Sequence, residues 1–113
     1  MRVAIVGSRS LDDRCYNVLE THMPQGTSEI VSGGAAGADA LAERFALERG
    51  LPLRIIRPDY KTYDKKAPLI RNSQIVAESD FALVLWDGTS RGSLNVIMTC
   101  IRTNKPYRVL LVE

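Results

Sequence analysis

The stretch IVSGGAAGADALAERFAL, from Ile30 to Leu47, passes from a β-strand pattern to a helical pattern within a few residues. Three glycines, Gly33, Gly34 and Gly37, mark the junction. Glycines at such a turn let a phosphate approach the backbone, where the first helical N–H groups are unpaired. The same glycines serve a tight turn when a helix packs closely on its sheet. The spacing alone leaves both interpretations open.

The residues after the glycines predict an amphipathic helix. Apolar side chains recur with the i, i+3, i+4, i+7, i+8 spacing, at Ala38, Leu41, Ala42, Phe45 and Ala46. Gly50 then supplies the residue at which such helices commonly end.

Working outward in both directions, similar apolar runs recur along the whole chain. We expect strands at Val3–Val6, Glu29–Ser32, Leu53–Arg57, Phe81–Trp86 and Tyr107–Glu113. These runs are nearly continuous rather than alternating, which is typical of parallel strands covered on both faces. Helix-length segments lie between them, so the chain predicts an α/β fold. We expect one domain over residues 1–113, a doubly wound three-layer sandwich with about five parallel strands and helices on both faces.

Composition excludes several classes of function. The net charge of the chain is only +2, which does not by itself indicate a nucleic-acid-binding protein. One histidine, His22, and two distant cysteines supply no plausible metal-ligand set, so we expect no metal and no chemistry at His22. Cys15 and Cys100 are expected to be buried, reduced thiols on helices. The N-terminus begins with a short strand, which predicts a cytoplasmic protein without a membrane span.

The loop after the first strand is the first candidate binding element. It reads GSRS, Gly7 to Ser10, and offers a permissive backbone, the hydroxyl of Ser8 and the guanidinium of Arg9. In open α/β sheets, ligands bind beyond the carboxyl ends of the strands, where this loop is expected. The alternative is a plain turn in which Ser10 caps the next helix.

The glycine loop after the second strand departs from the dinucleotide fingerprint. Its order is G-G-x-x-G rather than G-x-G-x-x-G, and Arg57 stands where an acidic residue would end the next strand. Standard NAD binding is therefore disfavoured. Asp39 lies in the first turn of the following helix, where its carboxylate competes with a phosphate for the N–H groups. This loop favours a ribose or a base over a phosphate.

The loop after the fourth strand is the better phosphate site. Asp87 precedes a run of small, hydroxyl-bearing and basic residues, Gly88, Thr89, Ser90, Arg91, Gly92 and Ser93. The helix that follows has no acid in its first turn, so its free N–H groups can attract an anion. The alternative is a polar turn with Ser93 as the N-cap.

The segment from Arg57 to Pro68 is polar and rich in lysine and tyrosine. We interpret it as a surface loop, in which Tyr60 and Tyr63 can stack on a base, while Lys61, Lys65 and Lys66 attract phosphates. An ordinary mobile loop would have the same composition. Arg71 and Asn72 follow on a helix placed just before the fourth strand, where a charged pair is either a solvated face or part of a site.

Four segments together, VGSR, VSGGAAGADALAERFA, RPDYKTYDKKAPLIRNSQIVAESDFALVLWDGTSRGS and KPYRVLLV, resemble the SLOG superfamily in order and spacing. The chain is most similar to its small YspA-like branch, and more distantly to the LOG phosphoribohydrolases and to DprA. The resemblance implies a Rossmann-like fold, a nucleotide or nucleotide-derived ligand and a homodimer. The apolar helix LNVIMTCI is suited to be core or interface.

The resemblance also assigns residues. Gly92 and Ser93 take the place of the phosphate-binding Gly-Thr of LOG enzymes, and Arg71 takes the place of their arginine. Val96 stands where those enzymes carry the catalytic glutamate, which disfavours hydrolysis by their mechanism. If the chain is an N-glycosidase, Arg71 and Asp39 are the catalytic candidates, with Asp87 as a second candidate acid.

The likeness to DprA implies a third reading. Arg71-Asn72 and Arg91–Leu94 resemble its RN element and SGSL loop, the region that DprA uses for single-stranded DNA. Neutralisation of the strand would then rest on Lys61, Lys65, Lys66, Arg71 and Arg91.

Our leading expectation is a nucleotide sensor or ligand-binding domain that requires no cofactor. The phosphate lies over Gly88–Ser93 with Arg71 as charge partner, the ribose and base lie toward Gly7–Arg9 and Gly33–Gly37, and Tyr63 caps the pocket. The candidate binding residues are Gly7, Ser8, Arg9, Gly33, Gly34, Gly37, Asp39, Tyr63, Arg71, Asn72, Asp87, Gly88, Thr89, Ser90, Arg91, Gly92 and Ser93.

Overall fold

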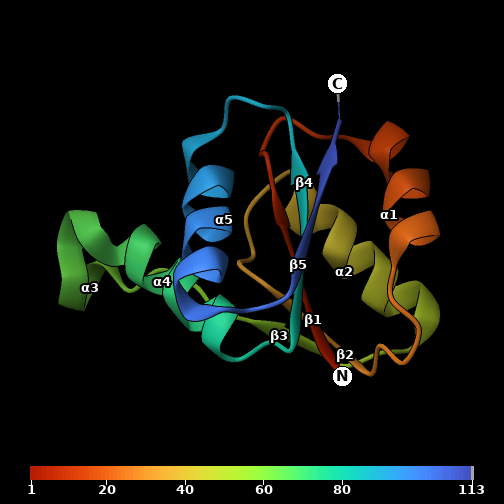
Figure 1. Cartoon of the computed structure of the whole chain (residues 1–113), viewed down its shortest axis with the longest axis horizontal. Coiled ribbons are helices and arrows are strands. Elements are labelled where there is room, and N and C mark those ends of the chain that lie inside the picture. Colours follow the sequence, from red (N-terminus) through yellow and green to blue (C-terminus); the bar gives the residue numbers. More distant parts are fainter. Residues whose placement is uncertain (113) are drawn as a thin grey trace.

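The computed structural model describes residues 1–112, so Glu113, at the end of the predicted last strand, lies outside the described residues. Strands and helices alternate along the chain (Figure 1), with two single 3-10 turns, at Asp13–Cys15 and Asp64–Lys66. In chain order the elements are β1 (Arg2–Gly7), α1 (Tyr16–His22), β2 (Glu29–Ser32), α2 (Ala38–Arg49), β3 (Leu53–Ile55), α3 (Tyr60–Tyr63), α4 (Ala67–Ala77), β4 (Phe81–Trp86), α5 (Arg91–Thr103) and β5 (Tyr107–Leu111).

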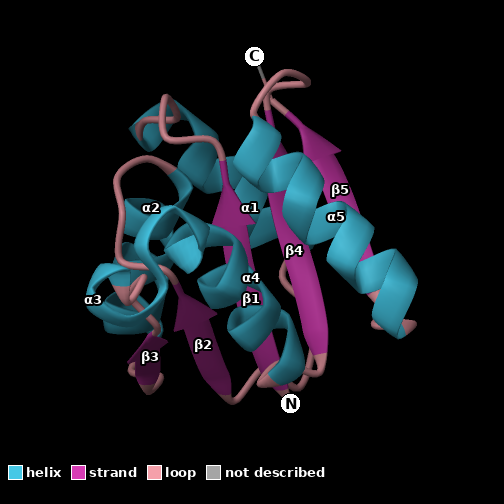
Figure 2. Cartoon of the chain, turned by 90° about the vertical axis from the view of Figure 1, so that its left-hand side faces the viewer, coloured by secondary structure: helices cyan, strands magenta, loops and turns pink. Residues whose placement is uncertain are grey.

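The strands form one parallel sheet in the order β3-β2-β1-β4-β5 (Figure 2). The chain moves outward from β1 to β3 and then returns to the other side of β1. The strand order therefore reverses between β1 and β4, which pair from Val3 opposite Phe81 to Gly7 opposite Leu85. This confirms the predicted doubly wound sheet, and it marks the point where ligands bind in such folds.

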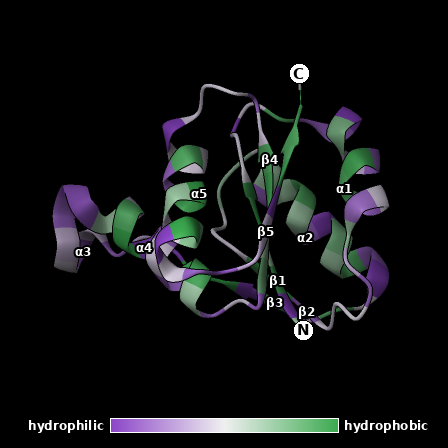
Figure 3. Ribbon diagram, viewed as in Figure 1, coloured by the Kyte–Doolittle hydropathy of each residue, from purple (hydrophilic) through white to green (hydrophobic). Residues whose placement is uncertain are grey.

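Two hydrophobic clusters bury the two faces of the sheet. Alternate residues of β1 point to opposite sides: Val3 and Ile5 pack with α1 and α2, whereas Ala4 and Val6 pack with α4 and α5. In Figure 3 the hydrophobic positions lie mainly along the strands and the helix faces turned toward them. The predicted three-layer, Rossmann-like sandwich is confirmed.

Three details differ from the expectation. β3 ends at Ile55 rather than Arg57, because β2 ends at Ser32, whose carbonyl accepts the last pairing bond from the Ile56 N–H at 2.9 Å. The lysine- and tyrosine-rich segment contains the helical turn α3 instead of being only a loop. Cys15 lies in a 3-10 turn rather than on an α-helix, although both cysteines are buried, free thiols as predicted.

The start of the first helical segment is capped by a different residue from the one predicted. The side chain of Asp12, not that of Ser10, accepts the backbone N–H of Arg14 at 3.0 Å. Ser10 lies in an exposed turn three residues before the first helical residue, Asp13. Within residues 1–112, no helix combines the length and apolar composition that crossing a bilayer requires.

Gly7, at the end of β1, and Gly37, the N-cap of α2, allow α2 to pack closely on the sheet. A Cβ on Gly7 would overlap the carbonyl oxygen of Leu85 and lie 2.9 Å from the Cβ of Ala38. Gly37 has φ +69°, and a Cβ there would overlap the backbone of Ser8 and Arg9. Gly37, one of the three glycines that raised the question of a phosphate turn, is therefore explained by packing.

We expect Gly37→Ala to lower the free energy of unfolding by about 3 kcal/mol or more, because backbone strain and steric overlap add. Gly50→Ala is the matched control. Gly50 has φ +64°, but a Cβ there would meet no atom within 4 Å, so it carries only the cost of a left-handed backbone, about 1 kcal/mol. Urea unfolding of both variants measures the difference. Equal losses would contradict the close packing of α2 on the β1 loop.

Candidate functional site

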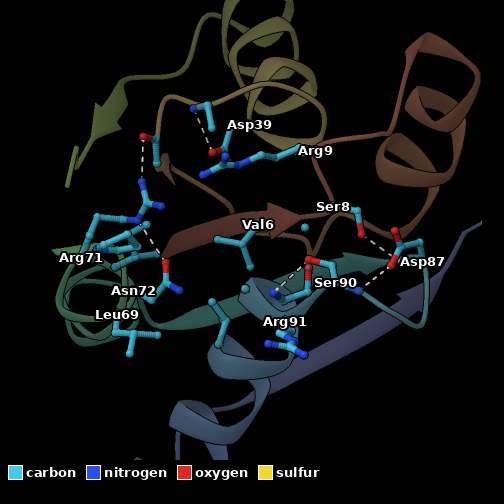
Figure 4. A pocket seen from close by; sticks show the side chains of 18 of the residues that line it. Val6, Ser8, Arg9, Asp39, Leu69, Arg71, Asn72, Asp87, Ser90 and Arg91 are labelled. Carbon is cyan, nitrogen blue, oxygen red and sulfur yellow. Dashed lines mark hydrogen bonds between the residues drawn. The ribbon is translucent and has the colours of Figure 1, made fainter. Parts of the chain in front are cut away.

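A cleft of about 490 Å³ opens at the point where the strand order reverses, beyond the carboxyl ends of β1 and β4. Its walls are the loops after β1, β2 and β4, together with α4 and the first turns of α5. Figure 4 shows Arg71 and Asn72 on one side of the cleft and Ser90 and Asp87 on the other, with Val6 between them. The fold thus places four segments that are far apart in sequence around one space.

Ser8 joins the two central strands at the base of this cleft. Its backbone N–H donates to the carbonyl of Leu85 at 3.0 Å, and its Oγ accepts the N–H of Asp87 at 3.1 Å. Its backbone carbonyl also accepts the N–H of Ala38, the first residue of α2, at 3.1 Å. Ser8 borders the cleft but is only 1 % exposed, so its main role is structural.

Asp87 organises the loop that was expected to hold a phosphate. Its Oδ1 accepts the N–H of Thr89 at 2.9 Å, the N–H of Ser90 at 2.8 Å and the Thr89 hydroxyl at 3.1 Å. The two backbone hydrogen bonds are the largest influences that lower the pKa of Asp87 from 3.8 to about 2. The N–H groups of Thr89 and Ser90 are therefore occupied by the protein's own carboxylate, and Gly88 and Thr89 do not line the cleft.

The N-cap of α5 is Ser90 rather than Ser93. The Ser90 Oγ accepts the N–H of Ser93 at 3.4 Å and the Ser93 hydroxyl at 3.3 Å, and Ser93 itself is 2 % exposed. The difference arises because Arg91 and Gly92 are already helical, so α5 begins earlier in the chain than predicted.

The first turn of α5 nevertheless offers free donors. Among residues 1–112, the backbone N–H groups of Arg91 and Gly92 have no acceptor, and the turn contains no acidic side chain. Gly92 lines the cleft and has open space around it. An anion can approach these two N–H groups directly.

Arg71 lies on the opposite side, buried to 8 % exposure on α4. Its Nη1 donates to the carbonyl of Gly33 at 3.1 Å and its Nε donates to Asn72 Oδ1 at 3.0 Å. Within the described chain Nη2 has no partner, and the side chain borders the cleft. Burial is the main influence that lowers the pKa of Arg71, while the nearby Asp39 carboxylate opposes that shift.

Gly33 is the glycine that this arrangement requires. A Cβ at Gly33 would lie 2.6 Å from Arg71 Nη1 and 3.0 Å from Asp39 Oδ2. The Asp39 carboxylate accepts the N–H of Ala35 at 3.0 Å, so it satisfies the loop's own backbone, as its position in the first turn predicted. The missing side chain at Gly33 makes room for Arg71 beside the loop.

A chain of amides extends this arrangement to α5. Asn72 Nδ2 donates to Asn95 Oδ1 at 3.1 Å. One path of hydrogen bonds therefore runs from the Gly33 carbonyl through the side chains of Arg71 and Asn72 to that of Asn95. Asn95 was not singled out from the sequence, since an asparagine in the middle of a helical segment has no local signal of a partner. The path links the loop after β2 and α4 to α5 across the cleft.

Most of the predicted site residues line the cleft: Gly7, Ser8, Arg9, Gly33, Asp39, Arg71, Asn72, Asp87, Ser90, Arg91, Gly92 and Ser93. The rest lie elsewhere. Gly34 has φ +74° and its side-chain space is filled by Ile55 and Arg57, and Gly37 faces the β1 loop. Gly88 and Thr89 form the Asp87 turn, and Tyr63 borders a second cavity.

Seven further residues line the cleft that were not among the predicted binding residues, although Val96 had been noted as standing in the place of the LOG glutamate. The additional lining residues are Val6, Ala35, Lys65, Pro68, Leu69, Ile75 and Val96. They give the cleft a largely apolar floor. Around it stand the basic side chains Arg9, Lys65, Arg71 and Arg91 and the acidic side chains Asp39 and Asp87, so positive charge is in excess. No group of three or more metal-ligating side chains gathers anywhere in residues 1–112.

Known proteins resemble this chain in sequence and in fold. Residues 1–63 match the YspA, cpYpsA-related SLOG family. Over 102 residues the chain is 35 % identical to the Gene 61 protein of Mycobacterium phage D29, a match that covers 81 % of this chain and 82 % of the phage protein.

Two solved structures are similar in fold. DNA processing protein A from Helicobacter pylori, described for its single-stranded DNA binding mode, matches all of this chain with a TM-score of 0.77 and 24 % identity. DNA processing protein A from Streptococcus pneumoniae matches 99 % of it with a TM-score of 0.78 and 21 % identity. The chain spans 66 % of the first protein and 50 % of the second, so the likeness is one of fold.

The Asp87 turn leads to a prediction about acid stability. Because the pKa of Asp87 is about 2 in the folded chain and ordinarily 3.8, its contribution to stability is complete above about pH 4 and is lost as the pH falls through about 2. Asp87→Asn cannot titrate, so its free energy of unfolding should fall less steeply between pH 4 and pH 2 than that of the wild type. Urea unfolding at pH steps across this window measures both slopes; parallel curves would contradict the assigned role.

Proposed function

The chain belongs to the YspA, cpYpsA-related SLOG family, and from that premise we propose that its cleft binds the phosphate of a nucleotide or nucleotide-derived ligand. One observation carries the proposal. The nearly buried guanidinium of Arg71, with Nη2 unpaired in the described chain, stands across an apolar floor from the unpaired N–H groups of Arg91 and Gly92. A buried cation facing free helical donors is suited to an anion.

We propose a smaller phosphate site than the Gly88–Ser93 loop that the sequence indicated. Asp87 occupies the N–H groups of Thr89 and Ser90, so we place the phosphate over Arg91 and Gly92. A carboxylate would repel an anion in the preceding turn, which also favours the α5 side.

Fewer loop glycines border the cleft, where a sugar or base could contact them, than the sequence indicated. Of the loop glycines only Gly7 and Gly33 border the cleft, and the space where their Cβ atoms would lie is already filled by other protein atoms. Beside them, Val6 and Ile75 provide an apolar surface for a ribose or a base. The sensor reading needs no catalytic group, and Val96, 2 % exposed at the cleft wall, offers none.

Turnover would have to use the chain's remaining acids. Asp39 and Asp87 both line the cleft, but each carboxylate already accepts backbone hydrogen bonds. A nucleoside-phosphate N-glycosidase therefore ranks below a binding domain. Chromatography for free base in the binding samples distinguishes the two.

The fold relation to the Helicobacter pylori protein favours single-stranded DNA as a second candidate ligand. The cleft is open to solvent on the side of Arg9 and Arg91, both exposed, and Lys65 extends the positive charge toward α3. The affinity for a strand bound through several of these cations would fall steeply as the salt concentration rises. The slope of log K against log salt concentration would be about −0.7 for each phosphate neutralised.

We also propose that α5 forms a homodimer interface. Leu94, Met98 and Ile101 are 44 %, 47 % and 55 % exposed, and their spacing places them on one face of the helix. The other face of α5 packs in the core, so this stripe is left for a second copy. We expect Met98→Glu to convert a dimer to a monomer in sedimentation velocity, whereas Leu47→Glu, at an apolar residue of α2 that is 84 % exposed, should not. A wild-type monomer would contradict the proposal.

The test of the phosphate site is Arg71→Lys, measured by calorimetric titration with AMP. An ammonium cannot donate to Gly33, Asn72 and a phosphate from one planar group, so we expect affinity to fall at least about 10-fold. Arg108→Lys, exposed on β5 and outside the cleft, is the matched control.

Because Arg71 also supports the glycine loop, the melting temperature of each variant is measured in parallel. A folded Arg71→Lys protein that binds AMP like the wild type would contradict the proposed site. Loss of AMP binding in Arg108→Lys as well would show that the assay does not report on the cleft.

A further inference from the structure

A second cavity, of about 620 Å³, lies against α3, the helical turn that projects beyond α4 at the edge of the molecule (Figure 1). Its lining is aromatic and charged: Tyr60, Tyr63, Asp64, Lys65 and Lys66. α3 is coloured mainly as hydrophilic in Figure 3, and none of its residues is buried. The core therefore does not explain why this turn carries two tyrosines.

The two tyrosines are presented on an ordered backbone. Tyr60 is 56 % exposed and Tyr63 is 39 % exposed, and Tyr63 lies three positions after Tyr60, so they share one face of the turn. Asp59 caps the turn, its carboxylate accepting the N–H of Thr62 at 3.1 Å and its carbonyl accepting the N–H of Tyr63 at 3.0 Å. Two exposed aromatic rings on a capped turn form a surface on which flat groups can stack.

The second cavity adjoins the phosphate cleft. Lys65 lines both spaces, so the two lie on either side of this one side chain. Lys61 and Lys66 add further positive charge on the side of α3. Basic side chains interleaved with exposed aromatic rings are the combination that single-stranded nucleic acid uses.

We propose that Tyr60 and Tyr63 form a base-stacking platform that continues the cleft, and that the ligand is a single strand of nucleic acid. Its phosphates lie along the path from Arg91 through Arg71 to Lys65, and an unpaired base lies on the tyrosine rings. This inference rests on the proposed phosphate site, and it identifies which of the two candidate ligands occupies it.

The sheet topology indicates how long the strand must be. α3 follows β3 and α5 follows β4, and the order β3-β2-β1-β4 places these two strands three strand spacings, about 14 Å, apart. At about 3.4 Å for each stacked nucleotide, that spacing requires at least about four nucleotides, because α3 projects beyond the edge of the sheet (Figure 1). A mononucleotide held at Gly92 does not span it, and the bases of a duplex are already stacked and paired.

The test compares two labelled strands of about twelve nucleotides by fluorescence anisotropy: oligothymidine, and an abasic strand with the same phosphates. The wild type should bind oligothymidine more tightly, because only that strand has bases to stack. Tyr60→Ala/Tyr63→Ala should weaken oligothymidine binding at least about 5-fold for each base lost from the platform. The same variant should leave binding of the abasic strand unchanged.

Two further variants separate stacking from folding and from non-specific effects. Tyr60→Phe/Tyr63→Phe keeps the rings and should bind like the wild type. Tyr107→Ala removes a tyrosine of similar exposure, 37 %, from β5 at the opposite edge of the sheet, and should have no effect.

The outcomes distinguish this inference from the function on which it rests. If the alanine pair binds oligothymidine as tightly as the wild type does, the platform is wrong while the cleft stands. If the wild type binds AMP but neither strand, the ligand is a mononucleotide and the inference is overturned while the proposed function stands. If the wild type binds none of the three, both are overturned.

Discussion

The structure depends on how closely α2 approaches the end of β1. The first turn of α2 is hydrogen-bonded to the loop after β1 through Ala38 and Ser8, and only glycine at positions 7 and 37 leaves room for that contact. The same Ser8 holds Asp87, so β1, β4 and α2 meet at one residue. The cleft opens directly beyond this junction, and its shape follows from the contact.

Which donors of the site are available to a ligand depends on which of them the protein's own carboxylates already satisfy. Carboxylates satisfy the donors of two loops: Asp39 serves the loop after β2, and Asp87 serves the turn before α5. Nη2 of Arg71 and the N–H groups of Arg91 and Gly92 have no partner within the described chain and are accessible from the cleft. Accessible donors beside a cation favour a ligand that carries negative charge and accepts hydrogen bonds.

The glycine loop shows how one motif can have two roles. Gly34 and Gly37 have positive φ and are enclosed by the chain, whereas Gly33 opens the space in which Arg71 reaches the loop carbonyl. A turn that resembles a phosphate loop in sequence thus acts mainly by positioning a cation. Phosphate recognition, as proposed, then depends on α4 and α5 rather than on the loop itself.

The order of the elements, the parallel sheet and its two covered faces were evident from the sequence, because hydrophobic periodicity is local and survives in a single chain. The gathering of Arg9 and Arg91 around one cleft was also expected, since the carboxyl ends of parallel strands meet at one edge. Arg71, on α4, was assigned to the site by the resemblance to LOG enzymes. Which donors stay free was decided only by tertiary structure. Arg71 and Gly33 are 38 residues apart and Asp87 and Ser8 are 79 apart, and no local pattern records a hydrogen bond over such a separation.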